Sequence, residues 1–299
     1  MYPILFTVPG IELKLPAFGA MVALAFIIGS HLLGKLSAKY GDDKEGDPER
    51  FAQITVWVLI GVVLGARAMY VVVEVLRELT ADIPTKTSVG RAFLDDPLSM
   101  LAIWQGGLVM YGGLFGAAVG GMWCARRLKV RTLHALDLGL ASGFFGLAIG
   151  RVGCLLVGDD FGAIVPESAR SLPFPITLSV PAVLRDGSLF GNANAGQVLW
   201  ATQPWMSLNA IALGLFGYWL LRRRKYAGQV SLILIVTYSV GRFVIENFRG
   251  DAIRGLWFDG SISTSQLVSI VVGIGALVLL FLNRSRSQPF NVTPVDAAA

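Results

Sequence analysis

The sequence contains few charged side chains and very little cysteine or histidine. Asp, Glu, Lys and Arg make up only 15% of the 299 residues, whereas a soluble domain has about 25%. Cys124 and Cys154 both lie in or at the edge of apolar runs, which argues against a disulfide framework. With only His31 and His134 beside them, a zinc site is not supported. We therefore expect a chain that holds no metal.

Long apolar runs are what the sequence has instead. Apolar residues make up 54% of the chain, and the mean hydropathy is +0.64. Several runs exceed the roughly 20 residues that a helix needs to cross a bilayer, and the short alternating segments of about 10 residues typical of a membrane barrel are not found. We predict an all-α polytopic membrane protein with seven transmembrane helices, near residues 15–36, 51–75, 101–125, 133–157, 203–221, 230–248 and 263–282.

These runs divide the chain into successive parts of one membrane domain. Residues 1–157 would hold transmembrane helices one to four, and residues 201–283 helices five to seven. Between them, residues 158–200 form the longest segment that does not span, with several prolines and a Gly/Asn-rich end. We expect a small extracytoplasmic subdomain there, which could hold short strands. Residues 284–299 would be a cytoplasmic tail.

The distribution of basic residues predicts the orientation of the chain. Lys and Arg clusters at 35–50, 126–131, 222–225 and 284–286 fall on one side if there are seven spans, and that side is cytoplasmic by the positive-inside rule. The N-terminus would then be periplasmic and the C-terminus cytoplasmic. Because the clusters lie between spans, we attribute the net charge of +5 to membrane topology and expect no nucleic-acid partner.

Arginines within the apolar runs are the clearest functional signal. Arg67, Arg151 and Arg242 each interrupt a predicted span toward its outer half, and a cation near hydrocarbon costs several kcal/mol unless it is paired or wetted. The planar guanidinium suits bidentate phosphate binding, so we predict a pocket for an anionic lipid headgroup. The alternative is that each arginine snorkels or pairs with a carboxylate, such as Glu246 one helical turn after Arg242.

Several glycine- and arginine-containing motifs occur in a fixed order along most of the chain. They are Gly150-Arg151-x-Gly-x-x-x-x-Gly158-x-x-x-Gly162, Gly65-x-Arg67-x-x-Tyr70, Gly106-Gly107-Leu-x-x-x-Gly112-Gly113, Asp137, Gly241-Arg242-Phe243-x-x-Glu246-x-x-Arg249-x-Asp251 and Thr264-x-Gln266. In order and spacing, this set resembles the prolipoprotein diacylglyceryl transferase family.

The resemblance implies an enzyme of the bacterial inner membrane. It would transfer the diacylglyceryl group of phosphatidylglycerol to the lipobox cysteine of preprolipoprotein signal peptides and release glycerol phosphate, without a cofactor. Arg151 and Arg242 would bind the phosphate and act in catalysis, Glu246 would orient Arg242, and Tyr111 would handle or position the thiol. The residues expected to shape the substrate pocket are Arg67, Tyr70, Gly112, Gly113, Gly158, Asp159, Gly162, Arg249 and Gln266.

Four positions depart from what is common in the family. Tyr111 stands where a histidine is frequent, Phe18 where a tyrosine is, Cys154 where an asparagine is, and Asn209 where a glutamate is. Tyrosine has an ordinary pKa near 10, so Tyr111 could be an activated base, a positioning group or an interfacial aromatic. These changes keep open two alternatives, a non-catalytic or transport-type protein that binds anionic lipid and a transferase with another donor or acceptor.

Overall fold

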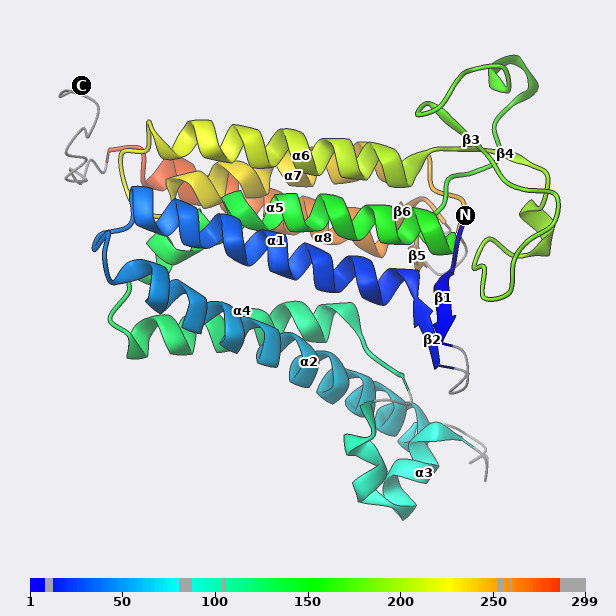
Figure 1. Cartoon of the computed structure of the whole chain (residues 1–299), viewed down its shortest axis with the longest axis horizontal. Coiled ribbons are helices and arrows are strands. Elements are labelled where there is room, and N and C mark those ends of the chain that lie inside the picture. The colour runs from blue at the N-terminus through cyan, green and yellow to red at the C-terminus, as the bar shows by residue number, and fades with distance from the viewer. Residues whose placement is uncertain (9–12, 81–87, 104–105, 252–254, 259, 286–299) are drawn as a thin grey trace. The chain divides into compact units, whose positions relative to one another are not determined.

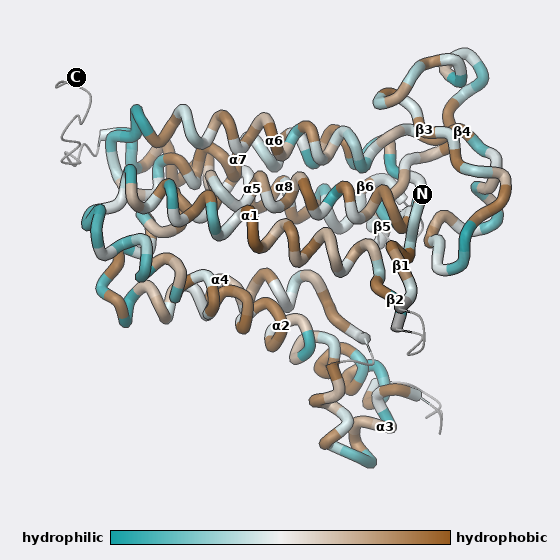
Figure 2. The backbone as a smooth tube through the Cα atoms, viewed as in Figure 1, coloured by the Kyte–Doolittle hydropathy of each residue, from teal (hydrophilic) through white to brown (hydrophobic). Residues whose placement is uncertain are grey.

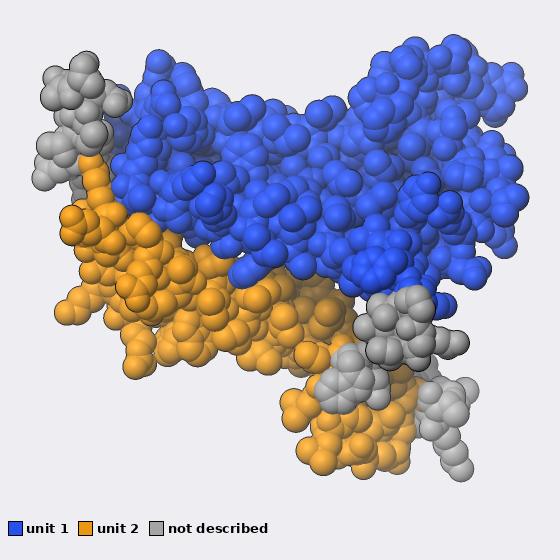
Figure 3. Space-filling model, viewed as in Figure 1, with its two compact units in different colours: residues 1–41, 136–299 blue, residues 42–135 orange. Residues whose placement is uncertain are grey.

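The structure is a computed structural model with two compact units (Figure 3). Unit 1 comprises residues 1–41 and 136–299, and unit 2 comprises residues 42–135. The residues described are 1–8, 13–80, 88–103, 106–251, 255–258 and 260–285.

Unit 2 is built on two helices that pack through glycines. They are α2 (Asp47–Leu79) and α4 (Met110–Arg127), and α3 (Val89–Asp95) and the 3-10 turn η1 (Pro97–Leu101) lie between them in sequence. A Cβ atom at Gly116 would collide with the main chain of Gly61, and one at Gly112 with Gly65. Small residues allow this close backbone approach in membrane proteins, so glycines are required along this helix pair.

Unit 1 holds four further long helices and most of α5 (Thr132–Val157), which crosses the boundary between the units. The others are α1 (Ala17–Tyr40), α6 (Thr202–Leu221), α7 (Gln229–Glu246) and α8 (Thr264–Leu282), and α7 packs against both α6 and α8 (Figure 1). Asp137 joins α5 to the start of α7, because its carboxylate accepts hydrogen bonds from the backbone amides of Gly228 at 2.8 Å and Ser231 at 2.7 Å.

Short strands lie at the end of unit 1 where α5 ends (Figure 1). β1 (Ile4–Val8) pairs with β2 (Leu13–Pro16), β3 (Thr177–Ser179) with β4 (Val198–Trp200), and β5 (Leu256–Trp257) with β6 (Ile262–Ser263), all antiparallel. The segment 158–200 also contains the 3-10 turns η3 (Glu167–Ala169) and η4 (Asn192–Asn194). Its small core is formed by Val180, Phe190 and Leu199. This segment is therefore a folded unit rather than a plain connector.

Six helices among the described residues are long and apolar enough to cross a membrane, namely α1, α2, α5, α6, α7 and α8. Figure 2 shows apolar residues along them and hydrophilic residues at several of their connections. These six correspond to six of the seven predicted spans and confirm a polytopic helical protein. The remaining one, α4, has 18 residues and a length of about 27 Å. Because it is not among the six, the count of seven stays a prediction.

The predicted start of the third span near residue 101 is wrong. The chain makes a 3-10 turn at 97–101 and becomes α-helical only at Met110. Gly106 and Gly107 have φ angles of +84° and +73°, which interrupt a right-handed helix and which glycine adopts readily. The sequence therefore forms a loop before α4, although its apolar residues continue the pattern of a span.

Candidate anion-binding site

The site in unit 1 begins at the turn that ends α5. Gly158 has a φ of +81°, and its amide donates to the carbonyl of Cys154 at 2.8 Å. A Cβ at Gly158 would collide with the ring of Phe190. Two residues further on, Asp160 has a φ of +53°, a conformation that costs a non-glycine residue about 1–2 kcal/mol and that Asp tolerates better than most.

The start of α6 holds this turn in place. The Thr202 hydroxyl donates to the carbonyl of Asp160 at 2.9 Å, and the Gln203 amide donates to the carbonyl of Asp159 at 2.9 Å. Thr202 and Gln203 are fully buried. The backbone of Asp159 and Asp160 is thus fixed by side chains from another helix, which determines the direction of the Asp160 side chain.

The carboxylate of Asp160 bridges two arginines. One oxygen forms an ion pair with Nη1 of Arg151 on α5, and the other accepts from Nη2 of Arg249 at 2.5 Å. The side chains of Arg151 and Asp160 are 14% and 22% exposed. Arg151 also donates to the Cys154 sulfur at 3.8 Å. Asp160, which follows the predicted Asp159 in sequence, is therefore the direct partner of Arg151.

Arg249 lies just after α7 and contacts three carboxylates. Its Nε donates to Asp251 at 2.8 Å, its Nη2 contacts the second Asp251 oxygen at 2.5 Å, and its Nη1 is 3.5 Å from Glu246. Its backbone forms a bridge with Gly162. A Cβ at Gly162 would collide with the main chain of Trp200. Gly162 therefore lets the segment after α5 approach Trp200 closely.

Arg242 connects to the same network through Glu246. Its Nη2 is 2.8 Å from Glu246 and donates to the Ser265 hydroxyl on α8 at 3.1 Å, and its Nη1 lies 3.6 Å from the Met206 sulfur on α6. Glu246 is 1% exposed. The continuous chain of contacts is Arg151, Asp160, Arg249, Glu246 and Arg242, to which Asp251 is attached, and we call these six residues the arginine cluster.

Charges within the arginine cluster balance, with three guanidinium groups and three carboxylates. Burial acts to raise the pKa of Asp160, but the charges of Arg151, Arg249 and Arg242 outweigh it and hold that pKa below its ordinary value. Burial, together with the negative charges of Asp160 and Asp251, raises the pKa of the neighbouring Asp159. Two consecutive carboxylates therefore have opposite preferences for ionisation.

Two other polar side chains, Tyr238 and Gln266, lie near the arginine cluster. Tyr238 on α7 lies near both Arg151 and Arg242, and its ring packs against Phe144 with centroids 5.5 Å apart. Gln266 caps the start of α8 by accepting from the Ser263 amide at 2.9 Å, and its Nε2 donates to Asn247 at 3.1 Å. Gln266 therefore fixes the position of α8 relative to the segment after α7.

The predicted site residues of unit 2 form a second group. Arg67 donates to the carbonyls of Met100 at 2.7 Å, Ser99 at 3.0 Å and Gly106 at 2.7 Å. The guanidinium also lies 5.5 Å from the ring centre of Tyr70. Arg67 is buried, and its donors hold the loop that precedes α4.

Tyr111, Gly112 and Gly113 lie in the first turn of α4, directly after this loop. Tyr111 is 37% exposed. A Cβ at Gly112 would collide with Met69 on α2, so this glycine serves the packing of the helix pair, and Gly113 lies farther from α2. Tyr111 is therefore the exposed polar group of this turn.

Three of the four positions that depart from the family pattern lie at the motifs that contain Arg151 and Arg242. Phe18 faces Gly153, whose Cβ position lies 3.4 Å from its ring, and Asn209 faces Gly241, the residue before Arg242. The third, Cys154, is buried beside Arg151. These replacements change polar groups around the cluster and leave its charged members in place.

Asp160 and Tyr238 were missed by the reasoning from the sequence. Asp160 belongs to the motif around Arg151, but its position in the sequence could not show which of two adjacent carboxylates turns toward the arginine. That depends on the positive φ and on the side chains of α6. Tyr238 lies four residues before Arg242, so helical spacing could have identified it as a neighbour on the same face.

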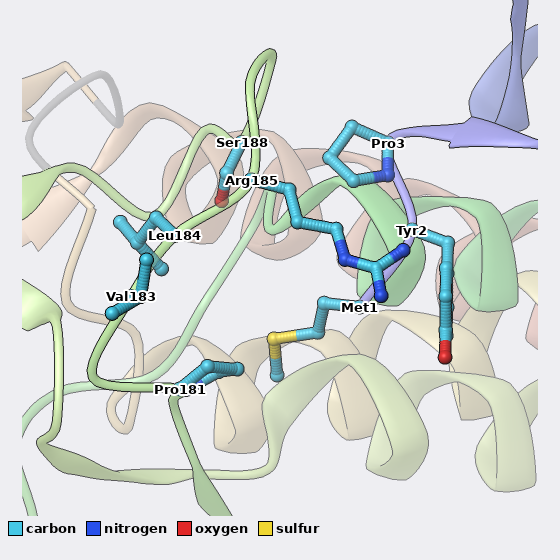
Figure 4. Close-up of a pocket in the computed structure, with 8 residues that line it drawn as sticks. All are labelled: Met1, Tyr2, Pro3, Pro181, Val183, Leu184, Arg185 and Ser188. Carbon is cyan, nitrogen blue, oxygen red and sulfur yellow. The ribbon is translucent and has the colours of Figure 1, made fainter.

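A separate cavity of about 270 Å³ lies between the N-terminus and the segment 158–200 (Figure 4). Its apolar lining residues include Met1, Pro3, Val183 and Leu184. The guanidinium carbon of Arg185 lies 4.1 Å from the ring centre of Tyr2. No residue of the arginine cluster lines it, so it is distinct from the anion-binding site.

The fold and the site define a polytopic membrane protein with a buried arginine cluster suited to an anionic group. The profile of the family described as prolipoprotein diacylglyceryl transferase matches residues 3–282. The chain therefore belongs to this family.

Curated relatives cover nearly the whole chain. One from Clostridium perfringens, named phosphatidylglycerol--prolipoprotein diacylglyceryl transferase 2, is 28% identical over 92% of this chain and 94% of its own length. Relatives of the same name without the numeral come from Clostridium tetani, 27% identical over 96% and 100%, and Gloeobacter violaceus, 29% identical over 90% and 89%. With the six apolar helices, these bacterial relatives indicate a multi-pass protein of the inner membrane.

Proposed function

We propose that this protein transfers the diacylglyceryl group of phosphatidylglycerol to the lipobox cysteine of preprolipoproteins. The observation that carries the proposal is the joining of Arg151 on α5 and Arg242 on α7 in one buried cluster. The names of the relatives from Clostridium perfringens and Clostridium tetani support the donor and the acceptor. The preprolipoprotein signal peptide and the bilayer are the partners, and no nucleic acid is involved.

The reaction is a displacement at a glyceryl carbon. The cysteine sulfur forms a bond to that carbon, the carbon–oxygen bond to the phosphate breaks, and the bonding electrons leave with glycerol phosphate. The thiol proton passes to a base or to water. Charge grows on the phosphate as the bond breaks, so preorganised guanidinium groups of Arg151 and Arg242 would stabilise the transition state.

The remaining members of the cluster orient these two arginines. Glu246 is paired with Arg242 within one helical turn, and Arg249 is held by Asp251. Gly158 and Gly162 allow the segment after α5 to pack closely against Phe190 and Trp200. Asp159 forms part of the turn there, and Gln266 fixes the start of α8. In this proposal they shape the pocket without contacting the reacting carbon.

Tyr111 is the residue that we propose to meet the thiol. Arg67 and Tyr70 hold the loop before α4, and this loop leads into Tyr111, whose hydroxyl would position the thiol by a hydrogen bond. A cysteine thiol has an ordinary pKa of about 8.5, so a nearby cation would help to form the thiolate.

The chemistry would take place on the outer side of the membrane. We propose seven spans that include α4, a periplasmic N-terminus, an extracytoplasmic segment 158–200 and a cytoplasmic C-terminus, because the basic clusters then share the cytoplasmic side. Cysteines introduced singly into 158–200 and into 222–225 test this topology. The first set should react with an impermeant thiol reagent in intact cells, and labelling of the second set would contradict it.

Complementation is the direct test of the function in cells. The gene should restore lipoprotein maturation in a bacterium depleted of its own transferase, and Arg151→Ala and Arg242→Ala should fail while still reaching the membrane. Rescue by Arg151→Ala at the wild-type level would contradict catalysis and favour a protein that only binds or moves anionic lipid.

A further inference from the structure

Arg151 depends on one carboxylate, whereas its neighbour Arg249 has three. Among the described residues, only Asp160 lies within ion-pair distance of Arg151. Arg249 contacts Asp160, Asp251 and Glu246. Loss of Asp160 would therefore leave Arg249 paired and Arg151 without a counter-charge. The two arginines differ in how easily an incoming anion could take the place of their partner.

Asp160 is held in position to serve as such a partner. Its carbonyl accepts from Thr202, its amide donates to the Asp159 carboxylate at 2.9 Å, and its positive φ directs the side chain toward the arginines. A carboxylate at this point has the charge and the planar pair of oxygens that suit a guanidinium. It therefore presents to Arg151 the same kind of group that a phosphate would.

We propose that Asp160 is an internal counter-ion that exchanges with phosphate at Arg151 and promotes the release of glycerol phosphate. It is a positioning residue, since it acts through Arg151. The inference rests on the proposed function. When the lipid binds, its phosphate replaces the Asp160 carboxylate on Arg151, while Asp160 stays attached to Arg249. After the transfer, the carboxylate returns to Arg151 and displaces the product.

The need for such a competitor follows from the charges of donor and product. The phosphodiester of phosphatidylglycerol carries one negative charge, whereas a phosphate monoester carries about 1.5 to 2 near neutral pH. Bare guanidinium groups would bind the product more strongly than the donor lipid, and turnover would be limited by release. A carboxylate fixed beside Arg151 competes with both anions for this arginine. When the carboxylate pairs with Arg151 again, it favours release of the product.

Product inhibition by added glycerol phosphate tests the exchange. Asp160→Asn is the central variant, because asparagine also tolerates a positive φ and removes only the charge. The purified variant should be inhibited at concentrations at least about tenfold lower than wild type, the scale of one charge-assisted hydrogen bond. Its KM for phosphatidylglycerol should fall or stay unchanged while its kcat falls.

Asp251→Asn is the matched control, since it removes the same charge from the arginine cluster but leaves the pair of Arg151 and Asp160 intact. Inhibition of this variant by glycerol phosphate should differ from that of wild type by less than about threefold, because Arg151 keeps its counter-ion. Asp160→Gly provides a second test of Asp160, because glycine adopts the required φ without strain. This variant should again be inhibited more strongly than wild type.

Equilibrium dialysis with labelled glycerol phosphate separates the two claims. If wild type modifies no lipobox peptide, the proposed function fails. Even then, tighter binding of glycerol phosphate to Asp160→Asn than to wild type would support the role of Asp160 as a counter-ion. The counter-ion proposal is overturned if glycerol phosphate binds and inhibits both Asp160 variants no more strongly than wild type. Inorganic phosphate in the same experiment shows whether the site responds to the phosphate group alone.

Discussion

Arg67 and Gly106 are 39 residues apart in the chain, and the guanidinium of the first donates a 2.7 Å hydrogen bond to the carbonyl of the second. Further bonds to the carbonyls of Ser99 and Met100 make this arginine the centre of the loop before α4. A cation that the sequence suggested for phosphate is thus occupied by backbone oxygens. Its role in the proposed reaction is to place the first turn of α4.

Replacement of Arg67 by lysine should disturb this loop. Lysine has no planar fork and cannot donate to several carbonyls in fixed directions, so about two hydrogen bonds worth about 0.5–1.5 kcal/mol each would be lost. We expect transferase activity to fall about tenfold and the segment 97–109 to become more sensitive to limited proteolysis. Wild-type activity with an unchanged digestion pattern would show that the loop does not depend on Arg67.

Glu246→Gln should strongly destabilise unit 1. The change removes the buried counter-charge of Arg242 and one of the three carboxylates that contact Arg249. Breaking a buried ion pair costs about 3–5 kcal/mol. We expect a clearly lower Tm in detergent and loss of activity. Asp95→Asn breaks an exposed pair with Arg91 and is the control, for which no measurable change is expected. Equal Tm values for the two variants would contradict the role of Glu246 as a buried counter-charge.

Neighbouring carboxylates should respond to pH in opposite ways. Because the pKa of Asp160 is lowered by folding, ionised Asp160 stabilises the protein above its ordinary pKa of about 3.9. That contribution is lost as the pH falls through the lower folded-state value. The pKa of Asp159 is raised, so its ionised form disfavours the folded state at neutral pH.

Thermal unfolding at several pH values measures this difference. At pH 7, Asp160→Asn should lower the Tm, whereas Asp159→Asn should leave it unchanged or raise it. Below about pH 4, the ordinary pKa of an aspartate, Asp159 is protonated in both the folded and the unfolded state, so the effect of Asp159→Asn should disappear. A loss of stability in Asp159→Asn equal to that in Asp160→Asn at pH 7 would contradict the geometry of the turn.

Asp137 should be structural rather than catalytic. Its carboxylate accepts from two backbone amides and the Ser231 hydroxyl, and it lies 3.6 Å from Arg224. Asp137→Ala should therefore lower the Tm, because several buried donors lose their acceptor. The fraction of protein that remains folded should keep a normal KM for phosphatidylglycerol, and a raised KM at unchanged Tm would assign Asp137 to the lipid site.

Apolar runs predicted the helices well because membrane spans require them. The helices α1, α2, α5, α6, α7 and α8 begin and end within a few residues of the prediction. The loop before α4 was missed because apolar residues alone cannot show that two glycines adopt positive φ. The interaction of Arg67 with distant carbonyls also had no signal in the local sequence.

The candidate site was predicted in part. Arg242 and Glu246 are one turn apart on a helix, so their pairing followed from spacing. The connection of Arg151 to Arg249 through Asp160 joins three separate segments. It depends on a turn conformation and on the buried side chains of Thr202 and Gln203. Contacts of this kind arise from tertiary packing and could not be read from one sequence.

The central claim is that Arg151 and Arg242 bind one lipid phosphate during the transfer of its glyceryl group. The most direct measurement incubates purified protein with headgroup-labelled phosphatidylglycerol and a lipobox peptide, and follows both products by mass spectrometry. Wild type should form diacylglyceryl peptide and labelled glycerol phosphate in equal amounts, and Arg151→Ala and Arg242→Ala should form neither. Unmodified peptide with wild type, or equal turnover by either alanine variant, would contradict the account.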